Sequence, residues 1–171
     1  AAAVLLKYPG AKLRDFMGKV IPGPFVPMAA IPTTAGTGSE ATMFTVITDT
    51  ETDIKMLLKS PKLIPDVAVV DPAFSVSAPQ SITANTGLDA LTHAVESYTS
   101  RLAQPLTDML ALSAVKRIMA YLPRAWRDGT DLVAREQMAL AALEAGVCIT
   151  NASVTLVHGM SRPIGALFHV P

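Results

Sequence analysis

The stretch Thr86-Gly-Leu-Asp-Ala-Leu-Thr-His-Ala-Val-Glu, residues 86–96, places Asp89 and His93 four positions apart. In a helix, residues i and i+4 lie one above the other on the same face, so this spacing can direct a carboxylate and an imidazole to one point. Both groups are ligands for a borderline divalent ion such as iron or zinc, whereas harder ions prefer oxygen alone. The pattern therefore favours a metal site, with a hydrogen bond between His93 and Asp89 on a helix surface as the alternative.

Apolar residues of the same segment recur at helical spacing, which predicts a helix with one face in a core. The residues expected on that face are Leu88, Leu91, Val95 and Tyr98. Asp89, His93 and Glu96 form a polar stripe beside it. Two interpretations of Glu96 are open, a hydrogen-bond acceptor for His93 or, more simply, a solvated helix charge.

A third ligand is expected from His158, because it lies in the apolar run 154–160, where an unpaired imidazole would be costly to bury. The alternative is a core histidine that a backbone carbonyl satisfies. His169, close to the end of the sequence, is a weaker candidate. Two roles are open for His169. It could carry protons near the ligands, and it is then the one catalytic side chain that we predict, or it could be a solvated surface residue.

Composition limits the classes of partner. The 171 residues carry 14 basic and 14 acidic side chains, and 50% of the residues are apolar. Basic residues are scattered, which argues against a nucleic-acid or membrane partner and leaves small molecules and further copies of the chain. No signal peptide and no apolar run of membrane-spanning length stands out, so we expect a cytoplasmic protein. The single cysteine, Cys148, fits a reducing compartment and a buried, inert thiol.

The sequence changes character near Pro79, which predicts one domain over residues 1–79 and another over residues 80–171. The first part is rich in proline and predicts a strand at 26–31, a hairpin from 44–48 and 55–59, and a fully buried strand at 67–72. In the second part, apolar spacing predicts helices at 81–98, 106–122, 132–150 and 156–168, with breaks at Pro105, Pro123 and Gly129. A ligand site is expected where the two parts meet.

Residues 31–40, Ile-Pro-Thr-Thr-Ala-Gly-Thr-Gly-Ser-Glu, form a glycine-rich turn after the first predicted strand. The glycines permit backbone conformations closed to other residues, and the threonines add hydroxyl groups, so the loop could wrap a phosphate or a ribose. Its spacing is neither that of a Walker loop nor that of a GxGxxG fingerprint. A simple turn is therefore the alternative.

Five blocks of the sequence resemble, in this order, the iron-containing (group III) alcohol dehydrogenases. The blocks are residues 32–40, 47–49, 65–72, 86–96 and 158–166. The resemblance implies a multi-domain, dehydroquinate synthase-like fold, with a partial α/β dinucleotide-binding domain over 1–79 and a partial all-helical metal-binding domain over 80–171. It also implies a homo-oligomer, a dimer or larger, that interconverts an alcohol and an aldehyde or ketone by metal-assisted hydride transfer to or from NAD or NADP.

The resemblance also assigns roles to individual residues. In the family a divalent metal, usually Fe2+ and sometimes Zn2+, is held by an aspartate and three histidines, and Asp89, His93 and His158 fall on three of these positions. The glycine-rich loop matches the segment that contacts the cofactor. The loop residues expected near NAD or NADP are Thr33, Thr34, Gly36, Thr37 and Gly38. Lys55 aligns with a lysine that reaches the cofactor ribose, and a solvated hairpin charge is the alternative.

Three features depart from the family pattern. The position of the fourth metal ligand, a histidine, falls one residue beyond Pro171. Residues 1–6 resemble the helix that follows the family's pyrophosphate loop, so the chain resembles an internal fragment and is expected to have little activity alone. Arg162 stands where many members carry a second histidine thought to relay protons. Two alternatives are an inactive structural or dimerising unit, and a relative resembling polyol dehydrogenases or dehydroquinate synthases.

The metal-site hypothesis makes a geometric prediction. The ligating atoms of Asp89, His93 and His158 should lie within about 5 Å of one another, because metal–ligand bonds are about 2.0–2.3 Å long. The loop 33–38 should lie within about 20 Å of Asp89, because a nicotinamide and a small substrate must fit between them at reacting distance. Coordinates that place His158 away from the other two ligands would contradict the hypothesis.

Overall fold

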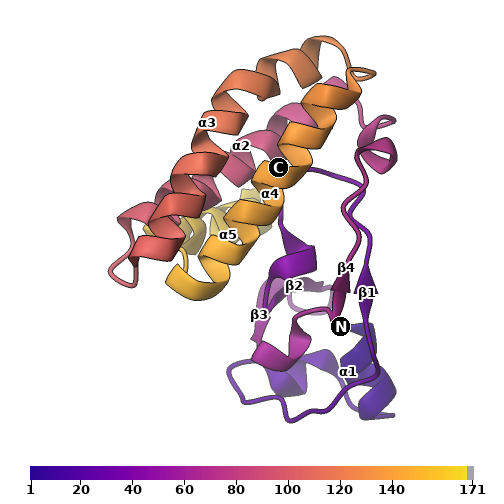
Figure 1. Ribbon diagram of the computed structural model, residues 1–171. Coiled ribbons are helices and arrows are strands. Elements are labelled where there is room, and N and C mark those ends of the chain that lie inside the picture. Colours follow the sequence, from indigo (N-terminus) through magenta and orange to yellow (C-terminus); the bar gives the residue numbers. More distant parts are fainter. Residues whose placement is uncertain (169–171) are drawn as a thin grey trace.

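The computed structural model of the chain describes residues 1–168, which form an α/β part and a helical part (Figure 1). The helices are α1 (Ala2–Lys7), α2 (Gln80–Thr99), α3 (Pro105–Arg127), α4 (Leu132–Ala152) and α5 (Leu156–Phe168). The strands are β1 (Ala29–Ala30), β2 (Phe44–Asp49), β3 (Ile54–Lys59) and β4 (Val67–Ala68). Short 3-10 helices include η2 (Ser39–Ala41) and η4 (Pro72–Ser75). The four predicted helices of the second part are thus confirmed.

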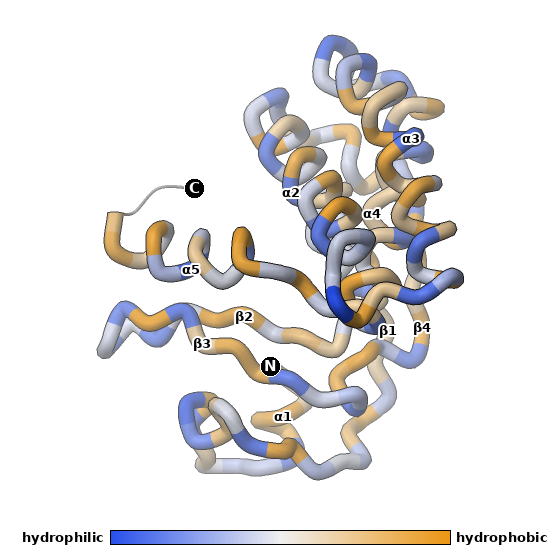
Figure 2. Tube along the Cα trace, turned by 90° about the vertical axis from the view of Figure 1, so that its left-hand side faces the viewer, coloured by the Kyte–Doolittle hydropathy of each residue, from blue (hydrophilic) through white to orange (hydrophobic). Residues whose placement is uncertain are grey.

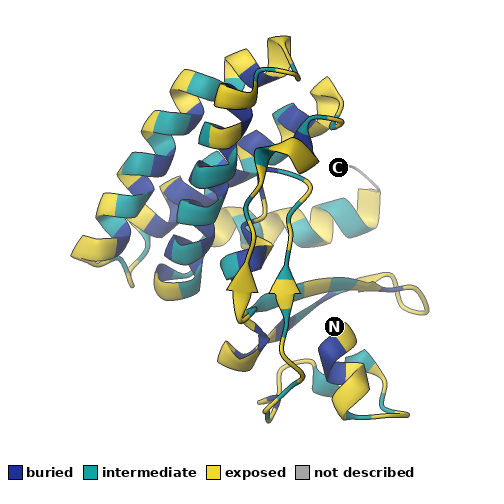
Figure 3. Cartoon of the chain, turned by 45° about the vertical axis from the view of Figure 1, so that its right-hand side comes forward, coloured by how far each residue is buried: buried dark blue, intermediate teal, exposed yellow. Residues whose placement is uncertain are grey.

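Small side chains form most of the contact between α2, α3 and α4. Their shared core consists mainly of alanines, with Ile118 and Met138 as its larger buried members. A Cβ added at Gly87 of α2 would lie 2.4 Å from Cδ1 of Leu122 in α3. Because small residues let helix axes approach closely, α2 packs tightly on α3 and α4, and Figure 3 shows buried residues on the inner faces of the bundle.

The predicted core face of α2 was wrong for three of its four residues, and only Leu91 packs against the core. The helix buries Gly87, Ala90 and Ala94 against its neighbours, whereas Leu88 is 53% exposed and Val95 and Tyr98 are also exposed. The close approach of α3 and α4 leaves room for alanine and glycine but not for leucine, so packing distance outweighs side-chain hydrophobicity here.

Helix α3 continues through Pro123, where the sequence predicted a break, and ends at Arg127. A proline inside a helix removes one hydrogen bond to the carbonyl four residues earlier. That carbonyl belongs to Met119, and both Met119 and Pro123 are exposed. Water can therefore satisfy the carbonyl, and the buried Ile118 and Ala125 on the other side of the helix keep the last turns in place.

In the α/β part, β2 and β3 form the predicted antiparallel hairpin, with Phe44 opposite Lys59 and Asp49 opposite Ile54. One face of β3 contributes Leu58 to a small core that it shares with Val4 of α1. Helix α5 contacts β3 as well, and Figure 2 shows α1 and α5 on opposite sides of the hairpin. The hairpin is therefore covered on both faces by helices from the two ends of the chain.

The predicted buried strand at 67–72 was wrong. Only Val67 and Ala68 form a strand, parallel to β1, and Val67 is 53% exposed. A parallel strand is buried when neighbours flank both of its edges and helices cover both of its faces. Within residues 1–168, β4 pairs only with β1, so Val67 stays exposed.

Two close contacts join the α/β part to the bundle. Gly38 has a positive φ of 58° and packs on α4, where a Cβ added at Gly146 would lie 2.6 Å from the carbonyl oxygen of Gly38. The buried Arg135 of α4 donates hydrogen bonds to the carbonyl of Ala78 (3.1 Å) and the hydroxyl of Thr83 (2.8 Å). The two hydrogen bonds of Arg135 fix the chain on both sides of Pro79, where it enters α2. The division into domains at residues 79 and 80 stays a prediction.

Two further sequence expectations concern Cys148 and membrane spans. Cys148 is buried in the bundle, as predicted, and burial raises the pKa of its thiol to about 11, which disfavours the reactive thiolate. Across residues 1–168, no single helix is long and apolar enough to span a membrane. Helices α4 and α5 reach that threshold only as a pair, and this pair is bent by 106°.

We predict that Gly146→Ala lowers the free energy of unfolding by about 1–3 kcal/mol, because the new methyl group overlaps the Gly38 backbone. Urea unfolding followed by circular dichroism measures the change. Gly159→Ala in α5 is the matched control, since nothing lies within 4 Å of its added Cβ, and it should be neutral or stabilising by up to about 1 kcal/mol. Equal losses in the two variants would contradict the account of the contact.

Candidate metal centre

The polar stripe of α2 faces the start of α5. Asp89 and His93 lie one turn apart on the helix, and His93 is only 6% exposed, whereas Asp89 is partly accessible. Ala90 and Ala94, which follow them in the sequence, are buried in the bundle. The packing of α2 on α3 and α4 therefore fixes the direction of the stripe, since all these residues belong to one rigid helix.

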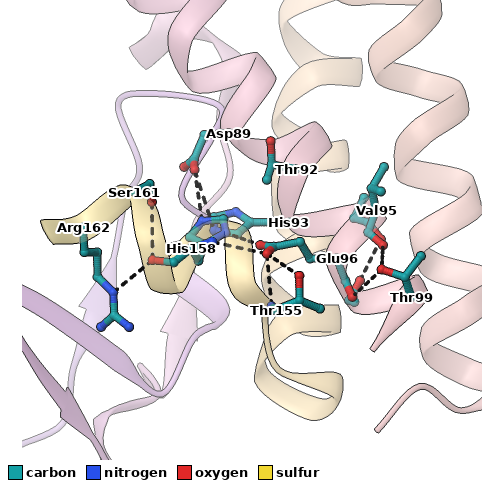
Figure 4. A network of polar contacts seen from close by, with 12 residues as sticks. Asp89, Thr92, His93, Val95, Glu96, Thr99, Thr155, His158, Ser161 and Arg162 are labelled. Carbon is teal, nitrogen blue, oxygen red and sulfur yellow. Dashed lines mark hydrogen bonds and ion pairs between the residues drawn. The ribbon is translucent and has the colours of Figure 1, made fainter. Parts of the chain in front are cut away.

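His158 reaches the stripe because the chain turns sharply after α4. Ser153 has a positive φ of 66°, and α5 leaves this turn at an angle of 106° to α4. This bend places the first turn of α5 against α2, with His158 facing the stripe (Figure 4).

The three side chains predicted as ligands converge, as predicted. One potential ligand atom from each of Asp89, His93 and His158 lies within 4.8 Å of the other two. Oδ1 of Asp89 is 3.5 Å from Nε2 of His158 and 3.8 Å from Nε2 of His93. The two imidazole rings stack with their centroids 4.5 Å apart. Figure 4 shows both rings next to the carboxylate of Asp89.

These spacings fit a shared cation better than direct hydrogen bonds. A hydrogen bond between nitrogen and oxygen is about 2.7–3.2 Å long, so the two distances to Asp89 are too long for strong ones. Two ligands of a tetrahedral ion, each about 2.1 Å from the metal, lie about 3.4 Å apart. One carboxylate and two imidazoles are also a donor set suited to iron or zinc. The residues present therefore fit a divalent metal.

The second nitrogen of His93, Nδ1, is buried and has no hydrogen-bond partner among residues 1–168. The backbone carbonyl of Gly36 lies close enough to favour the protonated ring, although not in hydrogen-bonding geometry. A metal-binding histidine usually donates its other N–H to a carbonyl or carboxylate. Gly36 is therefore the group placed to take this role.

The charges of the cluster are coupled. Burial raises the pKa of Asp89, but the polar contact with His158 and the charges of both histidines outweigh it, and the net pKa is lowered. The contact with Asp89 raises the pKa of His158, and that with Glu96 adds to it against the effect of burial. Burial lowers the pKa of His93, although Asp89 partly opposes this. The site thus favours one positive charge beside an ionised Asp89.

Glu96 is buried, so its interpretation as a solvated helix charge was wrong. Its carboxylate accepts hydrogen bonds from Thr155 and His158 at the start of α5, and not from His93 as the other interpretation held. Burial raises the pKa of Glu96, but the hydrogen bonds from Thr155 and His158 leave it below its usual value. The sequence carried a signal for this in Thr155, a typical residue at the start of a helix.

The glycine-rich loop lies beside the cluster. A Cβ added at Gly36 would lie 2.8 Å from Cα of Thr86, which precedes Asp89 by three residues in α2. With a rise of about 1.5 Å per residue, the loop is about 10 Å or less from Asp89, within the predicted limit. Gly36 and Gly38 are buried against α2 and α4, while Thr33 and Thr37 are exposed. Close packing thus accounts for the glycines, and the threonine hydroxyls face away from the core.

The remaining predicted residues lie at the edges of the site. Lys55 is half-buried on β3, and strand alternation places it on the face opposite Leu58, the face that α5 covers. Arg162, in α5, donates a hydrogen bond of 3.3 Å to the carbonyl of His158. His169 lies outside the described residues.

An α/β part joined to a helical bundle, with a carboxylate and two imidazoles where they meet, defines the class of the dehydroquinate synthase-like folds. Two family models match the chain. One, for iron-containing alcohol dehydrogenase, covers residues 1–72, and the other, for the C-terminal part of the Fe-containing alcohol dehydrogenase family, covers residues 83–171. The chain belongs to the iron-containing alcohol dehydrogenase family.

Known proteins of this family are similar over most of the chain. The NAD-dependent methanol dehydrogenase of Bacillus methanolicus is 44% identical over 93% of this chain, which spans 42% of that protein. The NADPH-dependent butanol dehydrogenase of Clostridium saccharobutylicum is 45% identical over 83% of this chain, which spans 36% of that protein. The sulfoacetaldehyde reductase of Bifidobacterium kashiwanohense, solved in complex with NAD+, superposes with a TM-score of 0.93 at 37% identity. It covers 100% of this chain, which spans 46% of that structure.

We predict that acid weakens the docking of α5. The pKa of Glu96 is lower in the folded than in the unfolded chain, where it is about 4.5, so the folded state binds this proton more weakly. The stability that Glu96 contributes is therefore fully present above about pH 4.5 and is lost as the pH falls through the lowered pKa. Urea unfolding between pH 7 and pH 3 should show this loss in the wild type and a smaller one in Glu96→Gln. Identical pH dependence in the two proteins would contradict the prediction.

Proposed function

We propose that the protein carrying this chain is an NAD(P)-dependent, metal-containing alcohol dehydrogenase that interconverts an alcohol and an aldehyde or ketone. The observation that carries the proposal is the convergence of Asp89, His93 and His158 beside the loop 33–38. Because the chain spans less than half the length of the relatives it matches, activity is proposed for the whole protein.

Asp89, His93 and His158 would hold Fe2+ or Zn2+. A divalent metal bound there would supply Lewis acidity toward the oxygen of a small alcohol or carbonyl compound. The ionised carboxylate of Asp89 would balance part of the charge of the cation, and the two imidazoles, when neutral, would bind it through Nε2, the nitrogen that each directs at Asp89. Asp89 is the most accessible of the three, so substrate would approach from its side of the cluster.

The loop 33–38 would hold the nicotinamide cofactor, which supplies or accepts the hydride. The exposed hydroxyls of Thr33 and Thr37 and the half-buried Thr34 are available to a phosphate, a ribose or the ring. Gly36 fixes the loop directly on α2 near the ligands. Lys55, on the α5 side of the hairpin, would approach the ribose of the cofactor.

Proton transfer and assembly complete the proposal. Among the described residues, the histidines of the site are committed to the metal, so His169 is retained as the proposed proton carrier. A homo-oligomer, a dimer or larger, and a cytoplasmic location stay predictions. The choices between NAD and NADP and between iron and zinc also stay open, since the relatives include NAD- and NADPH-dependent enzymes.

We predict that Asp89→Asn in the full-length protein removes the bound metal and lowers kcat/KM on the order of 10²–10³-fold. The amide keeps the size of the carboxylate but loses its charge, and Lewis-acid stabilisation is worth several kcal/mol. Elemental analysis of the purified protein and alcohol-dependent NAD(P)H formation are the measurements. Asp128→Asn, on the surface after α3, is the control and should keep both. Retention of metal and activity in Asp89→Asn would refute the proposed centre.

For the cofactor, we predict that Lys55→Ala raises KM for NAD(P) about 10–100-fold with a smaller change in kcat, because a hydrogen bond from a charged group contributes about 1.5–3 kcal/mol. Steady-state kinetics at saturating alcohol separates the two constants. Lys116→Ala, exposed on α3, removes a lysine far from the loop and should change neither. An unchanged KM in Lys55→Ala would leave the lysine as a solvated hairpin charge.

A further inference from the structure

Glu96 is the most deeply buried acidic side chain of the polar stripe, with 3% of its surface exposed. Burying a carboxylate costs several kcal/mol unless hydrogen bonds or an opposite charge compensate. Its partners are Thr155, which directly precedes α5, and His158 in the first turn of α5, 59 and 62 positions later in the chain. The contacts of Glu96 with the start of α5 therefore compensate for the cost of burying its carboxylate.

The two oxygens of Glu96 have different partners. Oε1 accepts hydrogen bonds from the backbone N–H of Thr155 (3.1 Å), the hydroxyl of Thr155 (2.6 Å) and the backbone N–H of His158 (3.3 Å). The first N–H groups of a helix have no partner within it, so this oxygen caps α5 from a neighbouring helix. The cap fixes both the position and the direction of the first turn of α5.

Oε2 of Glu96 contacts Nδ1 of the His158 ring. A carboxylate can only accept, so the proton of a neutral His158 is held on Nδ1. Nε2 is then left with a free lone pair, and this is the nitrogen that faces Asp89 at 3.5 Å. The same carboxylate thus places the helix and selects the tautomer that can bind a cation.

We propose that Glu96 is a positioning residue for the metal centre, holding the His158 ring with Nδ1 protonated and Nε2 directed at the point shared with Asp89 and His93. The inference rests on the proposed function, since it assigns a role toward the same metal. It adds a residue outside the ligand set and explains why Glu96 lies two helical turns from Asp89 on one stripe.

The environment of Oε1 makes Glu96→Gln a sharp test. Three donors surround this oxygen, so the amide of a glutamine must keep its oxygen there and turn its NH2 group toward Nδ1 of His158. An NH2 group donates, which favours the tautomer with the proton on Nε2. The substitution therefore keeps the cap of α5 and changes only which tautomer of His158 is favoured.

The experiment measures Zn2+ affinity of the full-length protein by competition with a chromogenic chelator. Glu96→Gln should bind Zn2+ about 10–100-fold more weakly than the wild type, the usual effect of losing a partner of a ligating histidine. Thr155→Val removes one donor to Oε1 but leaves the contact with Nδ1, so its loss should be clearly smaller. Glu144→Gln, a half-buried glutamate between α3 and α4, controls for the exchange itself and should bind as the wild type does.

A spectroscopic measurement separates ring orientation from general destabilisation. In the wild-type Zn2+ complex, 15N spectra of labelled histidines should show a proton on Nδ1 of His158 and the metal on Nε2. Zinc on Nδ1 would overturn the proposal from the wild type alone, whether or not the variants fold. So would a Thr155→Val loss equal to that of Glu96→Gln, since the effect would then come from capping.

The outcomes also distinguish this inference from the function on which it rests. A wild-type protein that binds no Zn2+ or Fe2+ would remove the proposed metal centre and the role of Glu96 with it. If the wild type binds Zn2+ and Glu96→Gln binds it equally well, the metal centre stands and only the role of Glu96 is refuted.

Discussion

The close packing of α2 on its neighbours is the constraint on which the rest of the site depends. Glycine and alanine bring α2 against α3 and α4, and Gly36 brings the loop against the same helix. Because α3, α4 and the loop cover the other sides of α2, the polar stripe faces the first turn of α5. Substituting a larger residue at Gly87 or Gly36 would rotate or displace α2 and so misdirect two ligands at once. The small residues are thus as important to the chemistry as the polar ones.

Electrostatics and packing agree at the centre. The pKa of Asp89 is lowered and that of His158 is raised by their contact, whereas burial lowers the pKa of His93. The arrangement is therefore pre-organised for one positive charge next to the carboxylate of Asp89. Such pre-organisation is typical of sites whose ligands are held by rigid elements.

The sequence predicted the local features well. The i,i+4 spacing of Asp89 and His93 and the hairpin of β2 and β3 depend on neighbours in the chain, and the structure has both. The buried residues were predicted poorly, because burial depends on what packs from elsewhere. Val67 is exposed where its neighbours do not cover it, and Glu96 is buried because α5 supplies donors from a distant segment. Tertiary contacts of this kind leave no periodic signal in one segment.

The span of about 60 residues between Glu96 and its partners has a consequence during synthesis. Asp89, His93 and Glu96 leave the ribosome together, but His158 follows 62 residues after Glu96. At translation rates of about 5–20 residues per second, the incomplete site exists for about 3–12 s in each nascent chain. During that interval an ion would find only Asp89 and His93, and Glu96 would lack the hydrogen-bond donors of α5. Stable metal binding therefore has to wait until the ribosome has made α5.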